Sequence, residues 1–203
     1  MSMIFLSAFI SSLFIGREEY FFKLKKYFAP CEKPWKRRSL LLYGMGGIGK
    51  SQIALNFAHN EQQSKYFSVT FWIDATSEDT IIQSLKNIQV EYNHIFKNSS
   101  ALSTNDQHIM LKWISNYYEQ EWLLIYDNAD HDNISLLKKY IPTGENGNIL
   151  MTSRNPYLAR ITDNVKEAVS EMCLKEALEL FFKASGLQNS SSNIYMHAEA
   201  IVT

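Results

Sequence analysis

The chain has 203 residues, enough for one domain of ordinary size with a substantial core. Hydrophobic residues make up 46% and charged residues 20% of the sequence, which excludes an intrinsically disordered chain. The formal net charge of -1 gives no reason to expect nucleic acid or a membrane surface as a partner. No run of about eighteen apolar residues occurs, so we expect no membrane span.

The first fifteen residues are apolar and rich in serine. A secretory signal needs a positively charged start, and no Lys or Arg precedes Arg17. We therefore favour a strand-like lead-in to the domain, or a misassigned start, over a working signal peptide. The two cysteines, Cys31 and Cys173, match no metal-binding spacing, so we interpret them as free thiols in a reducing, cytoplasmic compartment.

An amphipathic helix is predicted over 17–28, because aromatic residues and leucine recur at helical spacing, with acids in the first turn and lysines in the last. Pro30 and Pro34 end this helix in a linker. The linker carries four basic residues, Lys33, Lys36, Arg37 and Arg38. We interpret them as solvated, with a role in binding phosphate or nucleic acid as the alternative.

Short apolar runs alternate with amphipathic segments through most of the remaining chain. Strands are predicted over 39–43, 69–73, 122–126 and 148–152. Helices are predicted over 51–59, 76–88, 108–120, 134–140 and 175–184, with one helical turn at 155–160 and the opening of another helix at 197–202. Loops are predicted over 97–106 and 188–193. This alternation predicts βαβ units, with helices on both faces of a mainly parallel sheet.

Glycines recur between the predicted strand 39–43 and the predicted helix 51–59, in the segment Gly44-Met-Gly-Gly-Ile-Gly-Lys-Ser51. Backbone N–H groups can wrap a phosphate only where glycine lets the chain bend tightly, and the following helix directs its positive end at the anion. The residues expected to cradle phosphates are Gly44, Gly46, Gly47, Ile48, Gly49, Lys50 and Ser51. Lys50 would add charge for the β- and γ-phosphates, and the Ser51 hydroxyl would bind Mg²⁺. This segment, 44–51, has the Gly-x-x-x-x-Gly-Lys-Ser pattern of a P-loop, and it predicts binding of a nucleoside di- or triphosphate.

Charged residues follow two later strands of the predicted sheet. Asp127 ends an apolar run, and a carboxylate at the end of a buried strand in a P-loop protein is expected to hold Mg²⁺. Arg154 follows the predicted strand 148–152, and the carboxyl ends of parallel strands face the ligand. Arg154 is therefore a candidate sensor of the γ-phosphate, the alternative being a surface arginine that starts the next loop.

Taken together, five segments resemble the NB-ARC family, the STAND-class signal-transduction ATPases of plant resistance proteins, apoptotic scaffolds and fungal NOD-like receptors. The matching segments are 14–19, 41–51, 71–75, 122–130 and 147–154. The Asp-Asn-Ala-Asp form of 127–130, followed by Tyr-Ile-Pro-Thr-Gly at 140–144, is similar to the fungal branch. The resemblance implies an α/β P-loop NTPase fold, a three-layer sandwich with a mainly parallel central sheet.

The resemblance also implies a molecular switch in innate-immunity-like signalling, closed with ADP and opened by ATP for self-association. Arg17 would lie beside the adenine, and Gln52 would continue the helix beneath the phosphates. Asp127 would order Mg²⁺, and Arg154 would report the γ-phosphate. The expected partners are an adenine nucleotide and, in a full-length relative, a second copy or downstream repeat or effector domains.

The sequence departs from the family pattern at Asn128, where many relatives carry a second acid that activates water. An amide cannot accept a proton at neutral pH, so we expect slow or absent hydrolysis, with Asp130 as the candidate substitute base. The chain also stops at Thr203, before the family's C-terminal motifs. We therefore expect a lead-in at 1–13, an NB-ARC domain at 14–185, and a linker with the start of a truncated helical region at 186–203.

Three functions stay open from the sequence. The favoured one is an ADP/ATP-binding switch module. The second is an active P-loop ATPase or kinase, which needs an acceptor pocket or a clear catalytic acid. The third is a decayed interaction fragment without stable nucleotide binding. A GTPase is disfavoured, because no Asn-Lys-x-Asp motif occurs.

Overall fold

The computed structural model describes residues 3–5, 10–29, 36–64, 66–95, 107–115, 121–130, 134–187 and 192–202. The strands are β1 Met3–Phe5, β2 Arg38–Tyr43, β3 Val69–Asp74, β4 Trp122–Asp127, β5 Asn148–Ser153 and β6 Lys166–Ala168. The helices are α1 Glu18–Tyr27, α2 Lys50–Ser64, α3 Glu78–Ile95, α4 Gln107–Ser115, α5 Ile134–Lys139, α6 Leu174–Ser185 and α7 Ser192–Val202, with a 3₁₀ helix, η1, at Pro156–Ile161.

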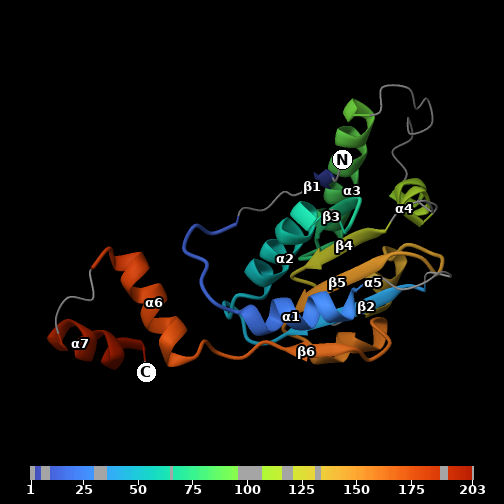
Figure 1. The fold of residues 1–203 in the computed structure, drawn as a ribbon. Helices are drawn as coiled ribbons and strands as arrows, with labels where there is room; N and C mark the ends of the chain where they lie inside the picture. The colour runs from blue at the N-terminus through green and yellow to red at the C-terminus, as the bar shows by residue number, and fades with distance from the viewer. Residues whose placement is uncertain are drawn as a thin grey trace.

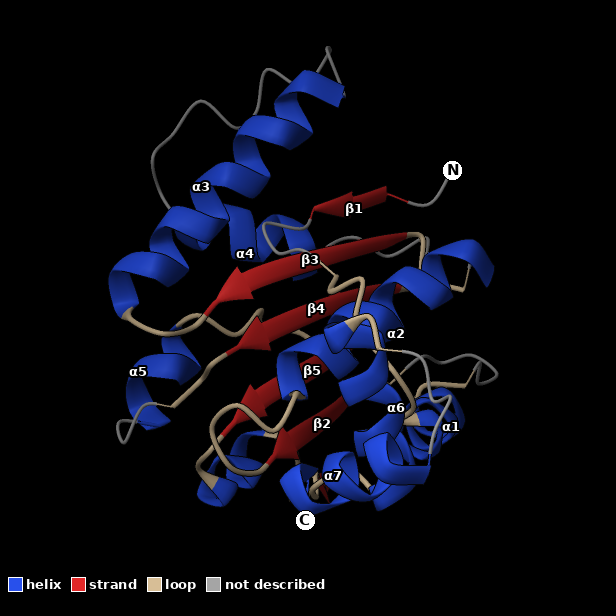
Figure 2. Cartoon of the chain, turned by 90° about the vertical axis from the view of Figure 1, so that its left-hand side faces the viewer, coloured by secondary structure: helices blue, strands red, loops and turns tan. Residues whose placement is uncertain are grey.

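The six described strands form one sheet in the order β1-β3-β4-β5-β2-β6. Every pairing between these strands is parallel, and the arrows of β3, β4, β5 and β2 run the same way in Figure 2. All of the strands therefore end at the same edge of the sheet. The loops that follow them meet at that edge, which is where ligands bind in sheets of this kind.

Two hydrophobic clusters cover the two faces of the sheet. One packs α3, α4, α5 and η1 against one face, and the other packs α1 and α2 against the opposite face. Neighbouring strand residues alternate between them, since Leu41 belongs to the first cluster and Leu40 and Leu42 to the second. This arrangement confirms the predicted α/β three-layer sandwich. Figure 1 shows α6 and α7 beside the sandwich, away from the sheet.

Most predicted elements lie within a few residues of the observed ones. A short strand, β1, lies within the predicted lead-in at Met3–Phe5. Strand β6 was not predicted, because its three residues include the exposed Lys166 and Ala168 rather than an apolar run. Helix α3 continues to Ile95, beyond the predicted end near residue 88. Several predictions fall outside the described residues: the two linker prolines, Cys31, Lys33, the loop 97–106, the end of the helix predicted at 108–120 and part of the loop predicted at 188–193. No helix in the described ranges is long and apolar enough to cross a membrane.

Two of the basic linker residues are structural, which corrects their interpretation as solvated. Arg37 donates hydrogen bonds to the carbonyl groups of Pro142 and Asn146, and its guanidinium lies 5.9 Å from the centre of the Trp122 ring. Burial lowers the pKa of Arg37. Arg38 donates to Asn148 and forms an ion pair with Glu121 at 3.5 Å. Both lie at the start of β2, the opposite end from the glycine-rich loop, which argues against a phosphate-binding role. Lys36 is exposed, as expected.

The close approach of Gly147 to Trp122 provides a test of the core. Gly147 has a φ of +85°, and a Cβ atom there would lie 2.0 Å from Cε2 of the fully buried Trp122. We expect Gly147→Ala to lower the free energy of unfolding in urea by about 3 kcal/mol or more, because overpacking adds to the strain of a left-handed backbone. Gly186→Ala is the matched control, since Gly186 has a φ of +68° and an added Cβ meets nothing within 4 Å. It should cost about 1 kcal/mol. Equal losses would contradict the packing argument.

Candidate functional site

The glycine-rich loop connects the end of β2 to the start of α2, so the amino end of α2 points at the carboxyl edge of the sheet. Gly44 donates its backbone N–H to Ser153 O at 3.2 Å, and a Cβ atom on it would lie 2.6 Å from Val169 O. Gly47 and Gly49 have φ values of +78° and +101°, with nothing within 4 Å of an added Cβ. Gly44 is therefore required for space, whereas Gly47 and Gly49 are required for backbone conformation.

Lys50 lies inside the loop and is only 7% exposed. Its Nζ donates to the carbonyl groups of Gly44 at 2.9 Å and Met45 at 2.8 Å. Burial lowers the pKa of Lys50 below its ordinary value, and the charge of Arg154 adds to this, while the charges of Asp130 and Asp127 oppose it. Because both of these hydrogen bonds from the ammonium group go to neutral carbonyl oxygen atoms, a phosphate would offer it stronger, charge-assisted bonds.

Three segments converge on the buried carboxylate of Asp127, which is 7% exposed. Ser51 Oγ and Thr152 Oγ1 each donate a hydrogen bond to Asp127 Oδ1 at 2.6 Å. Burial raises the pKa of Asp127 above its ordinary value, and the hydrogen bonds from Ser51 and Thr152 oppose that rise. The carboxylate and the Ser51 hydroxyl are neighbouring oxygen ligands, and Mg²⁺ prefers a few such ligands completed by phosphates and water. The residues therefore fit a magnesium site. The described part of the chain holds no group of three or more His, Cys, Asp or Glu residues that could bind a metal without such help.

Asn128 follows Asp127 in the left-handed conformation, with a φ of +58°. Its Nδ2 donates to Asp127 Oδ2 at 3.3 Å, and its backbone N–H donates to Thr152 Oγ1 at 3.0 Å. Asn128 thus braces the Asp127 carboxylate and supplies no acid at this position.

Asp130 and Arg154 form an ion pair, with Arg154 Nε 2.6 Å from Asp130 Oδ2. The backbone N–H of Arg154 donates to Asp130 Oδ1 at 2.6 Å, and Ser153 Oγ donates to the same oxygen at 3.0 Å. Burial alone would raise the pKa of Asp130, but the hydrogen bonds from Arg154 and Ser153 outweigh it, so that this pKa lies below its ordinary value. Asp130 is therefore ionised at neutral pH and bonded to Arg154 and Ser153.

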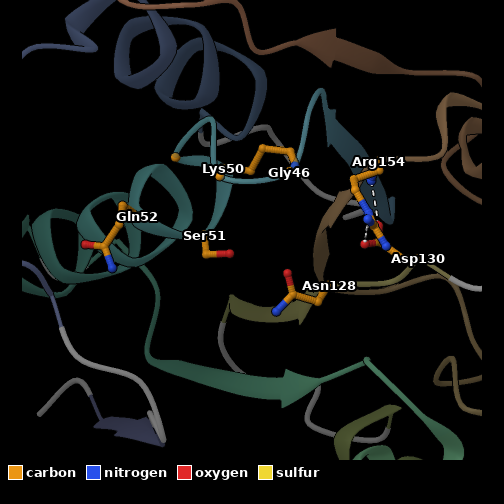
Figure 3. A pocket seen from close by; sticks show the side chains of 9 residues that line it. Gly46, Lys50, Ser51, Gln52, Asn128, Asp130 and Arg154 are labelled. Carbon is orange, nitrogen blue, oxygen red and sulfur yellow. Dashed lines mark hydrogen bonds and ion pairs between the residues drawn. The ribbon is translucent and has the colours of Figure 1, made fainter. Parts of the chain in front are cut away.

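These groups surround a cavity of about 400 Å³ (Figure 3). Its lining residues are Gly46, Gly47, Gly49, Lys50, Ser51, Gln52, Asn128, Asp130 and Arg154. The structure therefore brings the glycine-rich loop, the predicted sensor and the substitute base together, with Asp127 reached through Ser51. Gly44 lies in the turn behind the cavity.

A second, more apolar cavity of about 300 Å³ adjoins the first and shares Gly47, Gly49 and Gln52 with it. Its other lining residues are Ser11, Leu13, Phe14, Ile15, Arg17, Ile48, Met172 and Leu180. Of the sequence-predicted residues, Arg17 and Ile48 therefore line this cavity and not the first.

Arg17 closes the second cavity by connecting three segments. Its guanidinium donates to Ser170 O at 2.6 Å and to Ile48 O at 2.9 Å, and its backbone N–H donates to Glu176 Oε1 at 2.8 Å. Arg17 has a φ of +64° and is 5% exposed. A Cβ atom on Gly16 would collide with the Glu176 carboxylate, so a larger residue there would displace this connection.

Sequence reasoning missed Thr152, Glu176, Met172 and Leu180 as site residues. Thr152 lies next to Asp127 because β4 pairs with β5, and Tyr126 is in register with Met151. The other three belong to α6 or the segment before it, which carries no motif. The one available signal is a polar residue that directly follows the apolar run 149–151 at the carboxyl end of a strand, and it applies only to Thr152.

Replacing Asp127 with asparagine should stabilise the metal-free protein at neutral pH, because it removes a buried charge. The raised pKa means that the folded state binds this proton more tightly than the unfolded state, so ionisation of Asp127 costs stability above the folded pKa. We expect Asp127→Asn to gain about 1 kcal/mol at pH 7 in EDTA, measured by urea unfolding. The gain should shrink as the pH falls through the folded pKa toward the ordinary value of 3.8. The exposed Asp79 provides the control, since Asp79→Asn should give no such gain. A loss at pH 7 for Asp127→Asn would contradict the prediction.

Comparisons with known proteins agree with this geometry. The NB-ARC domain family matches residues 31–191. A nucleotide-binding leucine-rich repeat (NLR)-like protein of Hyaloscypha variabilis is 27% identical over 191 residues, covering 84% of this chain and 18% of that protein.

Among solved structures, Cdc6p of Pyrobaculum aerophilum has a TM-score of 0.64 at 12% identity, covering 98% of this chain and 57% of that one. A STAND protein with a tetratricopeptide repeat sensor from Pyrococcus horikoshii has a TM-score of 0.55 at 15% identity, covering 93% of this chain and 28% of that one. These structures support the fold. The family match covers most of the sequence, so the chain belongs to the NB-ARC domain family, as a P-loop nucleotide-binding module.

Proposed function

We propose that this chain binds ADP and ATP together with Mg²⁺ as a molecular switch and hydrolyses ATP slowly or not at all. The observation that carries this proposal is the pair of adjoining cavities, one polar and one apolar, which share Gly47, Gly49 and Gln52. A nucleotide has the same two-part chemistry, an anionic phosphate chain joined through a sugar to a flat base.

In the polar cavity, the backbone of the glycine-rich loop and Lys50 would bind the phosphates. Lys50 would exchange its bonds to the Gly44 and Met45 carbonyl groups for charge-assisted bonds to phosphate oxygen atoms. Ser51 and Asp127 would hold Mg²⁺, which would neutralise phosphate charge when bound. Their 2.6 Å hydrogen bond supports this assignment, because it already joins the two ligand atoms.

The apolar cavity would receive the base, with Ile15, Ile48, Met172 and Leu180 against its faces. Guanine carries a carbonyl and an amino group that need polar partners, and burying them unpaired costs free energy. Adenine has fewer such groups, so this lining favours adenine. Arg17 would act mainly by holding the wall of the cavity, since its guanidinium is bonded to Ile48 O and Ser170 O.

Weak hydrolysis follows from the groups that face the cavity. Asn128 supplies no base. The Asp130 carboxylate accepts three hydrogen bonds, and its lowered pKa makes it a poor proton acceptor. The site is thus equipped for binding nucleotide rather than for fast turnover.

The switch would rest on the one difference between ADP and ATP, the γ-phosphate near Arg154. In a longer cytoplasmic relative, the exchange of ADP for ATP at Arg154 would change how the chain binds a second copy or its own downstream repeat and effector domains. We propose no nucleic acid partner.

We propose 14–185 as the nucleotide-binding unit, with 1–13 as the lead-in and 186–203 as the start of a helical region. This chain covers 18% of the NLR-like protein that it resembles, so we do not assign the activity of that whole protein to it.

Lys50→Ala should weaken ADP binding by at least about tenfold, because it removes the buried cation that faces the phosphates. The measurement is a titration with a fluorescent ADP analogue, with and without Mg²⁺, where we expect a dissociation constant on the order of 1 μM for the unaltered chain. Lys86→Ala removes an exposed lysine of α3 and should leave binding unchanged.

The same titration, together with an assay of phosphate release from ATP, separates the other candidate functions. Absence of saturable binding would support a decayed fragment and refute the proposal. Steady release of phosphate at several turnovers per second would support an active ATPase. Equal binding by Lys50→Ala and the unaltered chain would place the nucleotide elsewhere.

Leu180→Arg should block the apolar cavity and test the base assignment separately. We expect this substitution to weaken ADP binding by about tenfold or more, while inorganic triphosphate binds as before, because the polar cavity is untouched. Leu187→Arg is the matched control, as Leu187 is 49% exposed and lines neither cavity. Loss of triphosphate and ADP binding together would contradict separate base and phosphate sites.

A further inference from the structure

The ion pair between Asp130 and Arg154 lies at the edge of the phosphate cavity. We propose that Asp130 is a positioning residue that holds Arg154 so that the free edge of its guanidinium meets the γ-phosphate and distinguishes ATP from ADP. This inference rests on the proposed function, because it requires a nucleotide in the cavity.

The geometry of the pair fixes the arginine at two points. Asp130 Oδ1 accepts from the backbone N–H of Arg154, and Oδ2 accepts from Nε, both at 2.6 Å. Ser153 Oγ holds Oδ1 from a third direction at 3.0 Å. A carboxylate that bonds both the main chain and the side chain of one residue restricts the torsions between them, so the direction of the guanidinium is set before any ligand arrives.

The rest of the guanidinium remains available. Within the described part of the chain, Nη1 and Nη2 of Arg154 make no hydrogen bond, and the side chain is 65% exposed against 26% for Asp130. A Cβ atom on Gly46 would lie 3.6 Å from Arg154 Cδ, so the arginine stem runs against the P-loop backbone. Figure 3 shows both residues at the cavity that also contains Lys50.

Positioning of Arg154 should strengthen its binding to phosphate. A free arginine side chain loses rotamer entropy when it binds a phosphate, whereas a side chain that is already held loses less. The negative charge of Asp130 acts in the opposite sense, since it repels a γ-phosphate. The sign of the effect of removing Asp130 therefore decides which contribution is larger, and our proposal requires that ATP binding weakens.

Two other roles for Asp130 make different demands on the geometry. A general base must take a proton from water, but each Asp130 oxygen atom accepts a hydrogen bond from Arg154, which stabilises the carboxylate without the added proton. If Asp130 competed with the γ-phosphate for Arg154, its carboxylate would bond the terminal nitrogen atoms Nη1 and Nη2. It bonds Nε and the backbone N–H instead.

The test is a double-mutant cycle of Asp130→Asn and Arg154→Ala in the full chain. The asparagine side chain introduced by Asp130→Asn has nearly the same size and can still accept from the Arg154 backbone, but its neutral amide loses the ion pair. The measured quantity is the ratio of affinities for ADP and a non-hydrolysable ATP analogue with Mg²⁺. We expect Arg154→Ala to lower the preference for ATP by about tenfold and Asp130→Asn by about fivefold, with no further loss in the double variant.

Each outcome supports or overturns the inference. An unchanged ratio of ATP-analogue to ADP affinity in Asp130→Asn refutes positioning. A raised affinity for the ATP analogue in this variant shows that Asp130 competes with the γ-phosphate for Arg154, and it also overturns the inference. Equal losses for ADP and ATP, or a lowered midpoint of urea unfolding that accounts for them, identify a purely structural role. Loss of hydrolysis at an unchanged ATP:ADP ratio identifies a base.

Glu91→Gln is the charge-matched control. Glu91 is exposed on α3, thirteen residues after its start, or roughly 20 Å along the helix axis. It should leave the ratio unchanged. Nucleotide binding that depends on Lys50 but not on Asp130 would overturn this inference alone, whereas absence of any nucleotide binding would overturn it together with the proposed function.

Discussion

The Asp127 carboxylate is the point on which the site depends. One of its oxygen atoms accepts from Ser51 on α2 and from Thr152 on β5, so a single buried group connects three parts of the chain. The parallel sheet makes this possible, because β2, β4 and β5 are neighbours and end at one edge. Thr152 is in register with Leu42 of β2, whose strand leads into the P-loop. A change in strand order would separate these groups even with every local element intact.

The charges around the phosphate cavity are balanced, with Lys50 and Arg154 against Asp127 and Asp130. The two cations are held differently, and the difference matches the roles that we propose for them. Lys50 is buried and bonded to neutral carbonyl groups, so any phosphate offers it a better partner. Arg154 is exposed and already paired, so it gains less from a general anion and more from one that arrives in a particular direction. The first arrangement suits affinity for every nucleotide, and the second suits a choice between two of them.

The parts of this fold that could be predicted from the sequence are those whose signal is local. The P-loop, the strand that ends at Asp127 and the alternation of helices and strands each depend on a few consecutive residues. The contacts of Thr152, Glu176, Met172 and Leu180 could not be predicted, because they depend on which strands are neighbours and on where α6 lies. The basic residues Arg37 and Arg38 were misjudged for the same reason, since several of their partners, Pro142, Asn148 and Glu121, are more than eighty residues away in the sequence.

The effect of Asn128 on the site depends on its contact with Asp127. Burial raises the pKa of Asp127 above its ordinary value. A second carboxylate at position 128 would add a like charge beside it and raise that pKa further. Asparagine instead donates its amide to Asp127 and accepts the left-handed backbone at low cost. Asparagine at this position therefore offers no base, which supports the slow or absent hydrolysis that we propose, and it favours the ionised Asp127 that the proposed magnesium site needs. Under this proposal, weak turnover and firm binding follow from the same side chain.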